Sequence, residues 1–231
     1  MKKPAFTLAE TLIVMGVIGV VAALTLPNLN SSTNDKEKVA KLQKVYSNLQ
    51  DAFGRAEAVY GPYDEWFVND GNDNNKRTKR AFERITEFMK YSKVCTVSDN
   101  CELKFSTGAS SGGETRDYSI ILADGSTLGF SEWGQCIYID IDGINKGSNK
   151  PGRDVFQVGI RPDNNNGQYI LTYGFRDHIK ENYYCCERNY GSGEYTAWVL
   201  VNGNMDYLKT SDGKTCPDGQ KLQFGVKTTC K

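Results

Sequence analysis

The stretch that decides the expected fold covers residues 5–26 and reads AFTLAETLIVMGVIGVVAALTL. Lys2 and Lys3 precede it, and its last 16 residues contain no charge. Residues 6–26 would span roughly 30 Å as a helix, which matches the hydrocarbon core of a bilayer. The sequence therefore predicts a membrane-spanning helix at 6–26, with its basic end in the cytoplasm and the rest of the chain outside.

Glu10 distinguishes this stretch from an ordinary secretion signal. A cleaved signal also has a basic start and an apolar run, and the small residues at 21–23 would suit a signal peptidase. A plain uncleaved anchor is the other alternative. Neither a cleaved signal nor a plain anchor requires Glu10. A charge at this place is also unfavourable, since it costs about 2.5–3.5 kcal/mol at the centre of a membrane helix and less near its end. An unpaired acid in an apolar segment therefore indicates a functional role.

The segment Ala5-Phe6-Thr7-Leu8-Ala9-Glu10 with its apolar run resembles the leader of type IV prepilins and type II secretion pseudopilins. In that family a membrane peptidase cuts before the phenylalanine and methylates the new amine. The resemblance implies processing at Ala5 and Phe6, although the family usually has Gly where this chain has Ala5. It also implies assembly through Phe6 and Glu10, in which Glu10 of one subunit pairs with the Phe6 amine of a neighbour. Pairing offsets the cost of each charge in lipid.

An apolar stripe at helical spacing follows Pro27, a residue that bends or ends helices. Its members are Val39, Leu42, Tyr46, Leu49, Phe53, Ala56 and Tyr60. Gly61-Pro62 ends the stripe. The pattern predicts an amphipathic continuation of the helix that packs on the chain's own sheet, with a two-stranded coiled coil as the alternative.

Beyond residue 62 the sequence becomes strand-like. We expect a short helix at 79–91 and strands at 118–122, 126–130, 137–139, 155–160, 169–173, 195–201 and 205–208. The turns at 123–125 and 202–203 are typical of β-hairpins. The expected fold class is α+β, with a long N-terminal helix (a membrane half plus an amphipathic half) packed on a C-terminal antiparallel sheet. This pilin-like arrangement is also what the resemblance implies.

The expected division of the chain follows from these segments. It comprises a leader peptide (1–5), a transmembrane and assembly helix (6–26), its amphipathic continuation (27–61), and a globular periplasmic or extracellular domain with disulfides (62–231).

All seven cysteines follow the apolar stretch, on the side of the membrane where disulfides persist. They are Cys95, Cys101, Cys136, Cys185, Cys186, Cys216 and Cys230. Proximity along the chain suggests the pairs 95–101 and 216–230, leaving Cys136 to pair with either vicinal cysteine and one thiol unpaired. Zinc is the alternative, but the chain has no C-x-x-C motif and one histidine.

The loop at 140–154 is rich in carboxylates, amides and glycines. Oxygen ligands of this kind suit Ca²⁺, and the candidates are Asp140, Asp142, Asn145, Asn149 and Asp154. The loop does not match an EF-hand, because its glycine is at the fourth position and Pro151 replaces the bidentate glutamate. The alternative is a turn-rich connection in which these side chains bond their own backbone. No other cofactor is expected.

Composition narrows the function classes further. Lys and Arg number 28, as do Asp and Glu, and loss of residues 1–5 with their two lysines would leave a net charge of −2. This balance gives no support to direct nucleic-acid binding. The single histidine, His178, lies near Cys185 without any recognisable catalytic signature, so no enzymatic activity is expected.

The predicted function is a pilin-like structural subunit of a type IV pilus or type II secretion pseudopilus, or of a DNA-uptake filament. Its expected partners are other pilin-like subunits, the prepilin peptidase, the inner-membrane assembly machinery and the lipid bilayer. The expected location is the bacterial inner membrane with a periplasmic C-terminal domain, and the pilus after assembly. The alternative is a membrane-anchored extracytoplasmic binding module that does not polymerise.

Overall fold

The computed structural model of the chain describes residues 7–95, 103–105, 114–116, 118–131, 134–144, 146–163, 168–173 and 192–230. Within these ranges the side chains of residues 22, 24–33, 104, 105, 114–116, 192 and 193 are not described. The chain divides into two compact units, Met1–Glu37 and Lys38–Lys231, and each is described by itself.

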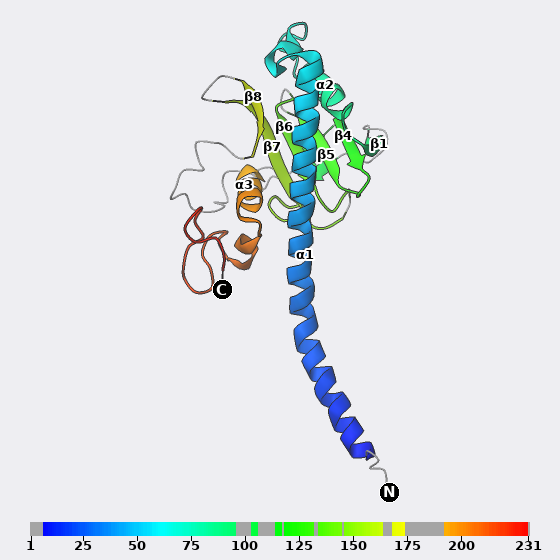
Figure 1. Cartoon of the computed structure of the whole chain (residues 1–231), viewed down its shortest axis with the longest axis vertical. Helices are drawn as coiled ribbons and strands as arrows, with labels where there is room; N and C mark the ends of the chain where they lie inside the picture. The colour runs from blue at the N-terminus through cyan, green and yellow to red at the C-terminus, as the bar shows by residue number, and fades with distance from the viewer. Residues whose placement is uncertain are drawn as a thin grey trace. The chain divides into compact units, whose positions relative to one another are not determined.

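The described part of the chain contains helices at both ends of the sequence and strands between them (Figure 1). The helices are α1 (Leu8–Tyr60), α2 (Asn74–Thr86) and α3 (Ser192–Asn202), with 3₁₀ helices η1 (Tyr63–Phe67) and η4 (Asp206–Lys209). The strands are β1 (Tyr91–Cys95), β2 (Leu103–Phe105), β3 (Glu114–Arg116), β4 (Tyr118–Leu122), β5 (Thr127–Ser131), β6 (Cys136–Asp140), β7 (Val155–Pro162) and β8 (Tyr169–Thr172).

Six of the strands form one antiparallel sheet in the order β1-β4-β5-β6-β7-β8, and β2 pairs with β3 in a second, two-stranded sheet. The predicted strands at 118–122, 126–130, 137–139, 155–160 and 169–173 are confirmed within a residue or two at their ends. The predicted turn at 123–125 joins β4 to β5, and Gly125 in this turn has a φ of +85°, which glycine adopts most easily.

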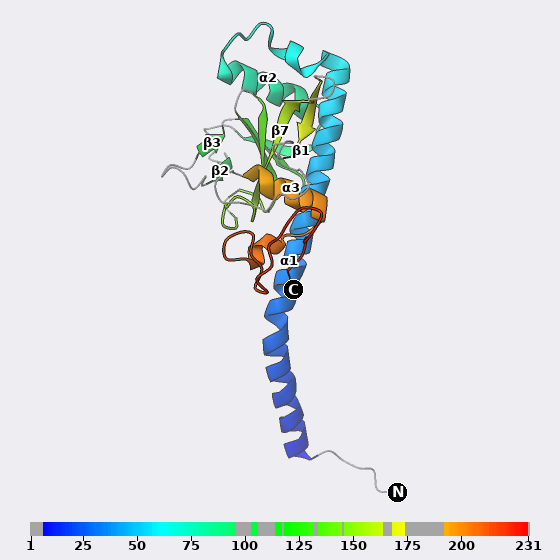
Figure 2. The ribbon, with the colours of Figure 1, turned by 90° about the vertical axis from the view of Figure 1, so that its left-hand side faces the viewer.

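The two faces of the six-stranded sheet carry different clusters. Ile137 and Ile139 of β6 belong to the main core, whereas Cys136 and Tyr138 belong to a second cluster with Leu103 of β2. This alternation is expected, because successive side chains of a strand point to opposite faces. Figure 2 shows α1 and the β2–β3 sheet on opposite sides of the larger sheet.

The predicted apolar stripe of α1 forms a large part of the main core. Its residues from Val39 to Ala56 are buried, and Tyr60 is partly buried against them. Tyr46 donates a hydrogen bond of 3.2 Å from its hydroxyl to the carbonyl of Leu171 in β8. The prediction that this stripe packs on the chain's own sheet is therefore confirmed.

The predicted fold class, a pilin-like α+β fold with a membrane half in its N-terminal helix, is contradicted. In the part of the chain that the structure describes, no helix is both long enough and apolar enough to cross a membrane.

The predicted hairpin at 195–208 is also wrong, since α3 and η4 occupy these residues. Trp198 and its neighbours Ala197 and Val199 are all buried, so this segment is apolar around its circumference. A short apolar run of this kind cannot be assigned to strand or helix from periodicity alone. Gly203 has a φ of +66° and donates from its nitrogen to the carbonyl of Val199, so the Asn-Gly pair ends a helix.

Two smaller differences concern the segment before the sheet. Helix α2 begins five residues earlier than predicted because Asp73 caps it, accepting a hydrogen bond from the nitrogen of Lys76 at 3.1 Å. The predicted helix extended to residue 91, but Tyr91 is the first residue of β1, an edge strand that the sequence reading had not assigned.

Candidate functional site

The N-terminal end of α1 is closed by a reciprocal pair of side chains. Glu10 Oε2 accepts hydrogen bonds of 2.8 Å from both the backbone nitrogen and the hydroxyl of Thr7. In return, the Thr7 hydroxyl oxygen accepts from the nitrogen of Glu10 at 3.3 Å. This is a capping box, which satisfies backbone donors that have no partner inside the helix. Ala5 and Phe6 lie outside the described residues.

The surface of α1 that follows is apolar and exposed. Leu8 is 80% exposed and Ile13 is 67% exposed, and seven further large apolar residues from Leu12 to Val21 exceed half exposure. Glu10 lies on this surface, where it lines a shallow groove with Thr11, Val14, Met15 and Ile18. Contiguous apolar surface of this kind marks a site of contact with a membrane or a protein.

The acidic loop, residues 140–154, connects β6 to β7 and is organised by Asp154. This fully buried carboxylate accepts four hydrogen bonds from the loop. Its Oδ2 accepts from the nitrogen and hydroxyl of Ser148 and from the nitrogen of Asn149, and its Oδ1 accepts from the nitrogen of Lys150. Asp154 therefore behaves as expected for the alternative to a calcium site, a turn-rich connection in which side chains bond their own backbone.

Three other oxygens of the described loop residues are buried without a hydrogen-bond donor. They are Oδ2 of Asp140, Oδ1 of Asp142 and Oδ1 of Asn149. Asp140 is 1% exposed, and its other oxygen accepts a 3.1 Å bond from the nitrogen of Gly143. Burial, followed by the neighbouring Asp142 carboxylate, raises the pKa of Asp140 to about 8. The folded loop therefore favours the protonated, neutral form of Asp140 beside the Asp142 carboxylate.

The backbone of the loop allows these oxygens to converge. A Cβ atom at Gly147 would lie 2.1 Å from Oδ2 of Asp142 and 2.6 Å from Oδ2 of Asp154, so only glycine lets these carboxylates approach one another here. Gly147 has a φ of +65°, and Asn149 has a φ of +48°, the left-handed region that asparagine tolerates.

The donor set fits a hard divalent cation in its chemistry. Asp140, Asp142, Asn149 and Asp154 supply carboxylate and amide oxygens, as Ca²⁺ requires, and three of these residues have an oxygen without a donor. Asn145 lies outside the described residues. Among the side chains that are described, no group of three or more acidic, histidine or cysteine residues is already arranged to hold a metal ion. Binding would therefore require these oxygens to move closer together.

Two lysines of α1 contact the acidic loop. Lys38 Nζ donates to the carbonyl of Arg153 at 3.2 Å and lies 3.8 Å from Oδ2 of Asp142. Lys41 Nζ donates to the carbonyl of Ile141 at 3.0 Å. The helix thus supplies positive charge to the loop from a position about 100 residues earlier in the sequence, which no local sequence signal could have indicated.

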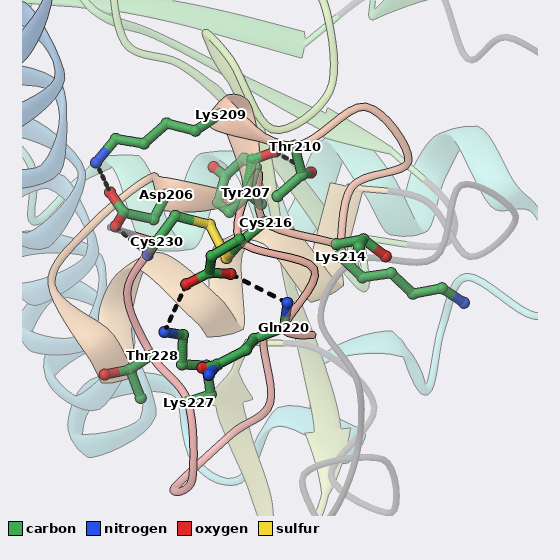
Figure 3. Close-up of a disulfide and its surroundings, with 12 residues drawn as sticks. Asp206, Tyr207, Lys209, Thr210, Lys214, Cys216, Gln220, Lys227, Thr228 and Cys230 are labelled. Carbon is green, nitrogen blue, oxygen red and sulfur yellow. Dashed lines mark hydrogen bonds and ion pairs between the residues drawn. A yellow bond between two sulfur atoms is a disulfide. The ribbon is translucent and has the colours of Figure 1, made fainter.

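The C-terminal segment is closed by a disulfide between Cys216 and Cys230, as predicted (Figure 3), with Cα atoms 5.4 Å apart. Asp206 of η4 accepts from the nitrogen of Cys230 at 2.8 Å and pairs with Lys209 Nζ at 2.7 Å. Tyr207 donates from its hydroxyl to the carbonyl of Gly152, which ties this segment to the acidic loop.

The remaining cysteines are described only in part. Cys95 is disulfide-bonded, and Cys136 is a buried cysteine of β6. Gln157 donates to its sulfur at 3.3 Å. Cys101, Cys185 and Cys186 lie outside the described residues, as does His178, so the predicted pair 95–101 stays a prediction. The predicted pairing of Cys136 with Cys185 or Cys186 is wrong, because Cys136 is not in a disulfide.

One functional residue near the N-terminus was missed by the sequence reading although its signal was present. Thr7 is the first residue of the pattern T-x-x-E directly before an apolar run, which is typical of a capping box. The reading of Glu10 as an acid with no partner in its own segment is therefore corrected, because Thr7 provides one.

The structure thus presents an apolar helix start with a capped glutamate, and a domain of a six-stranded antiparallel sheet closed by a C-terminal disulfide. By sequence, the chain belongs to a family of unknown function, DUF6613, whose model matches residues 28–225. The matched range covers the acidic loop and begins after the apolar stretch at 6–26. No curated protein and no solved structure matches the chain.

Proposed function

We propose that the chain is a structural subunit that is processed by a prepilin-type peptidase and assembles through its N-terminal helix into a filament. The filament would be a type IV pilus, a type II secretion pseudopilus or a related DNA-uptake filament. The observation that carries the proposal is Glu10 within the exposed apolar surface of α1. An exposed helix surface with one acid needs both apolar partners and a partner charge.

A second copy of the same helix supplies both requirements. Cleavage before Phe6 creates a positively charged amine at the start of each processed helix, and the apolar side chains of one copy cover those of another. Glu10 already accepts two hydrogen bonds from Thr7, so its carboxylate is oriented toward the beginning of the helix before any partner arrives. Pairing with the Phe6 amine of a neighbour then selects one staggered register between subunits.

Before assembly, the proposed subunit resides at the inner membrane, with the domain after residue 61 on the periplasmic side. The prepilin peptidase and the inner-membrane assembly machinery are its partners there, together with the lipid bilayer. The described residues contain no membrane-spanning helix, so this location has to be measured directly, by fractionation of the precursor between membrane and soluble fractions.

Substitution of Glu10 tests the assembly step. Glu10→Gln keeps an acceptor for Thr7 but removes the charge, and we expect the variant to accumulate normally yet to be absent from sheared filaments. Thr7→Val is the matched control, since it removes the hydroxyl that bonds Glu10 while keeping the carboxylate. Filaments that contain Glu10→Gln at the wild-type level would leave a binding module that does not polymerise as the better account.

A calcium ion in the acidic loop is the second part of the proposal. The buried oxygens of Asp140, Asp142 and Asn149 that lack a donor support it. A bound divalent cation would take these oxygens as ligands and hold the connection between β6 and β7. No activity depends on it in this account, because its role is to stabilise the displayed domain.

Thermal unfolding of the full-length chain in detergent tests the calcium site. We expect 1 mM Ca²⁺ to raise Tm relative to a chelator, and Mg²⁺ to raise it less because Mg²⁺ retains its waters. Asp140→Asn removes a carboxylate from the candidate ligand set, so it should abolish the response of Tm to Ca²⁺. An unchanged Tm of the wild-type chain in Ca²⁺ would remove calcium from the proposal and leave the filament proposal intact.

A further inference from the structure

The outer side of the acidic loop is basic. Its carboxylates are turned inward, since Asp140 and Asp154 are buried and Asp142 pairs with Lys38 of α1. The charged side chains that are exposed on the loop are those of Lys146, Lys150 and Arg153. We call these three residues the basic surface of the loop. The loop therefore presents positive charge to its surroundings although its composition is acidic.

The basic surface has no counter-charge in the part of the chain that the structure describes, where no ion pair joins its three cations to an acid. Its backbone is nevertheless held in place. Asp154 accepts four hydrogen bonds from the loop, and Lys38 Nζ donates to the carbonyl of Arg153 at 3.2 Å. Charges on a fixed backbone lose little freedom when a partner binds, so this surface is preorganised for an anionic partner.

A surface of opposite charge lies just beyond the C-terminal end of α1. Asp64 and Glu65 of η1 are exposed, and among the described residues neither forms an ion pair. We call these two residues the acidic turn. Burial, and to a smaller extent the Asp64 carboxylate, raises the pKa of the nearby Glu57 above its ordinary value. Negative charge is therefore in excess at this end of the helix.

The acidic turn is also held in place, and it is remote from the loop. Glu57 accepts a 3.1 Å hydrogen bond from the nitrogen of Tyr63, and the indole nitrogen of Trp66 donates to the carbonyl of Gly61 at 2.8 Å. Roughly 30 Å of helix separates Glu57 from Lys38, which contacts the loop. One copy of the chain therefore cannot bring its own basic surface and acidic turn together.

We propose that the basic surface of one copy docks on the acidic turn of the next copy, as a contact between the displayed domains of the filament. The inference rests on the proposed assembly through the N-terminal helix and adds a second contact to it. Because the two surfaces differ, each docked copy leaves one surface of each kind open, and such a contact propagates instead of closing. Exposed ion pairs are weak singly, but every step of the filament repeats this set of pairs.

Cross-linking of sheared filaments tests the contact directly. A carbodiimide joins lysine amines to carboxylates that touch them, and peptide mass spectrometry of the covalent dimer identifies the linked residues. We expect links from Lys146 or Lys150 of one copy to Asp64 or Glu65 of another. Filaments whose dimers lack these links would overturn the contact and leave the filament proposal intact. Absence of filaments would refute the assembly itself, and the contact with it.

Charge reversal tests whether the contact contributes to assembly. Lys146→Glu with Lys150→Glu reverses the basic surface, and Asp64→Lys with Glu65→Lys reverses the acidic turn. We expect each double variant to lower filament yield about fivefold, and the combination of all four changes to recover roughly half of the wild-type yield. Lys90→Glu is the control, since Lys90 is exposed and belongs to neither surface. It should change the yield by less than about twofold.

The opposite results are equally clear. Wild-type yield from both double variants, or a combined variant as poor as either of them, would overturn the contact. Loss of yield from the lysine changes alone, with normal yield from the changes at Asp64 and Glu65, would also overturn it and identify an anionic lipid surface as the better partner of the loop. Circular dichroism of each purified chain in detergent establishes that it is folded.

Discussion

Glu10 accepts two hydrogen bonds from Thr7, one from its backbone nitrogen and one from its hydroxyl, and each measures 2.8 Å. This pair starts α1 at the position where the apolar surface begins. Glu10 therefore has a role within its own chain in addition to the role between subunits that we propose. The two roles are compatible, because a carboxylate oxygen can accept more than one hydrogen bond.

Loss of the Thr7 cap should loosen the start of α1. In Thr7→Val the hydroxyl is absent, so the first turn loses the two bonds that the hydroxyl makes with Glu10 and keeps the one from the backbone nitrogen. Amide hydrogen exchange at residues 8–11 should therefore accelerate about fivefold. Exchange measured by mass spectrometry on the full chain checks this expectation. Exchange at residues 45–56, in the buried part of the same helix, serves as the internal reference and should not change.

Removal of the C-terminal disulfide should destabilise the domain measurably. Cys216 and Cys230 are 14 residues apart, and closing a loop of about this length contributes about 3 kcal/mol to the free energy of unfolding. Cys216→Ser combined with Cys230→Ser should lower the stability by that amount in chemical unfolding under non-reducing conditions. If the double variant unfolds at the wild-type denaturant concentration, the bond contributes nothing to the fold.

The ion pair between Asp70 and Arg80 should make stability fall in acid. Two bonds, of 2.5 and 2.7 Å, join the carboxylate to the guanidinium, and they hold the pKa of Asp70 below its ordinary value. The folded state thus favours the charged form, so the contribution is present above about pH 4 and is lost as pH falls through the lowered pKa.

Asp70→Asn isolates this contribution. Asp70 is buried but Arg80 is 38% exposed, so we expect a loss of about 1–3 kcal/mol at pH 7, less than for a fully buried pair. The difference from the wild type should shrink as the pH is lowered below about 4. A difference that stays constant down to the acid transition would mean that the carboxylate charge is not its source.

Substitutions of Gly203 test whether residues 192–202 form a helix that ends at this glycine. Its φ of +66° is strained for an L side chain, and open space surrounds the position of a Cβ atom. Gly203→Val should therefore cost about 1–2 kcal/mol through backbone strain alone, whereas Gly203→Asn should cost much less. Urea unfolding of the two variants measures the contrast, and equal losses in both would argue against this cap.

The sequence predicted the elements whose signals are local. The stripe from Val39 to Ala56 has the period of a helix with one buried face, and the segments around Ile137 and Phe156 carry β-branched and aromatic residues between turn signals. Such patterns constrain an element without knowledge of its neighbours. The same is true of the Cys216–Cys230 bond, whose partners are close in sequence.

An element that is apolar around its circumference could not be assigned in the same way. The segment around Trp198 packs on β7, where Thr196 accepts a hydrogen bond from the nitrogen of Gln157 at 3.0 Å. This environment makes a helix out of residues that have high strand propensity, an instance of tertiary contacts that override local preference. The contacts of Lys38 with the acidic loop are equally non-local, and only the folded structure places them together.

Identification of the mature N-terminus tests directly whether the chain is processed before Phe6. Mass spectrometry of the protein purified from membranes or filaments reads the first residue and its modification. We expect a chain that begins with Phe6, carries a methyl group on the amine and lacks the leader with Lys2 and Lys3. A chain that retains residues 1–5, or one cut near residue 24, would contradict the account and identify an anchored or secreted domain instead.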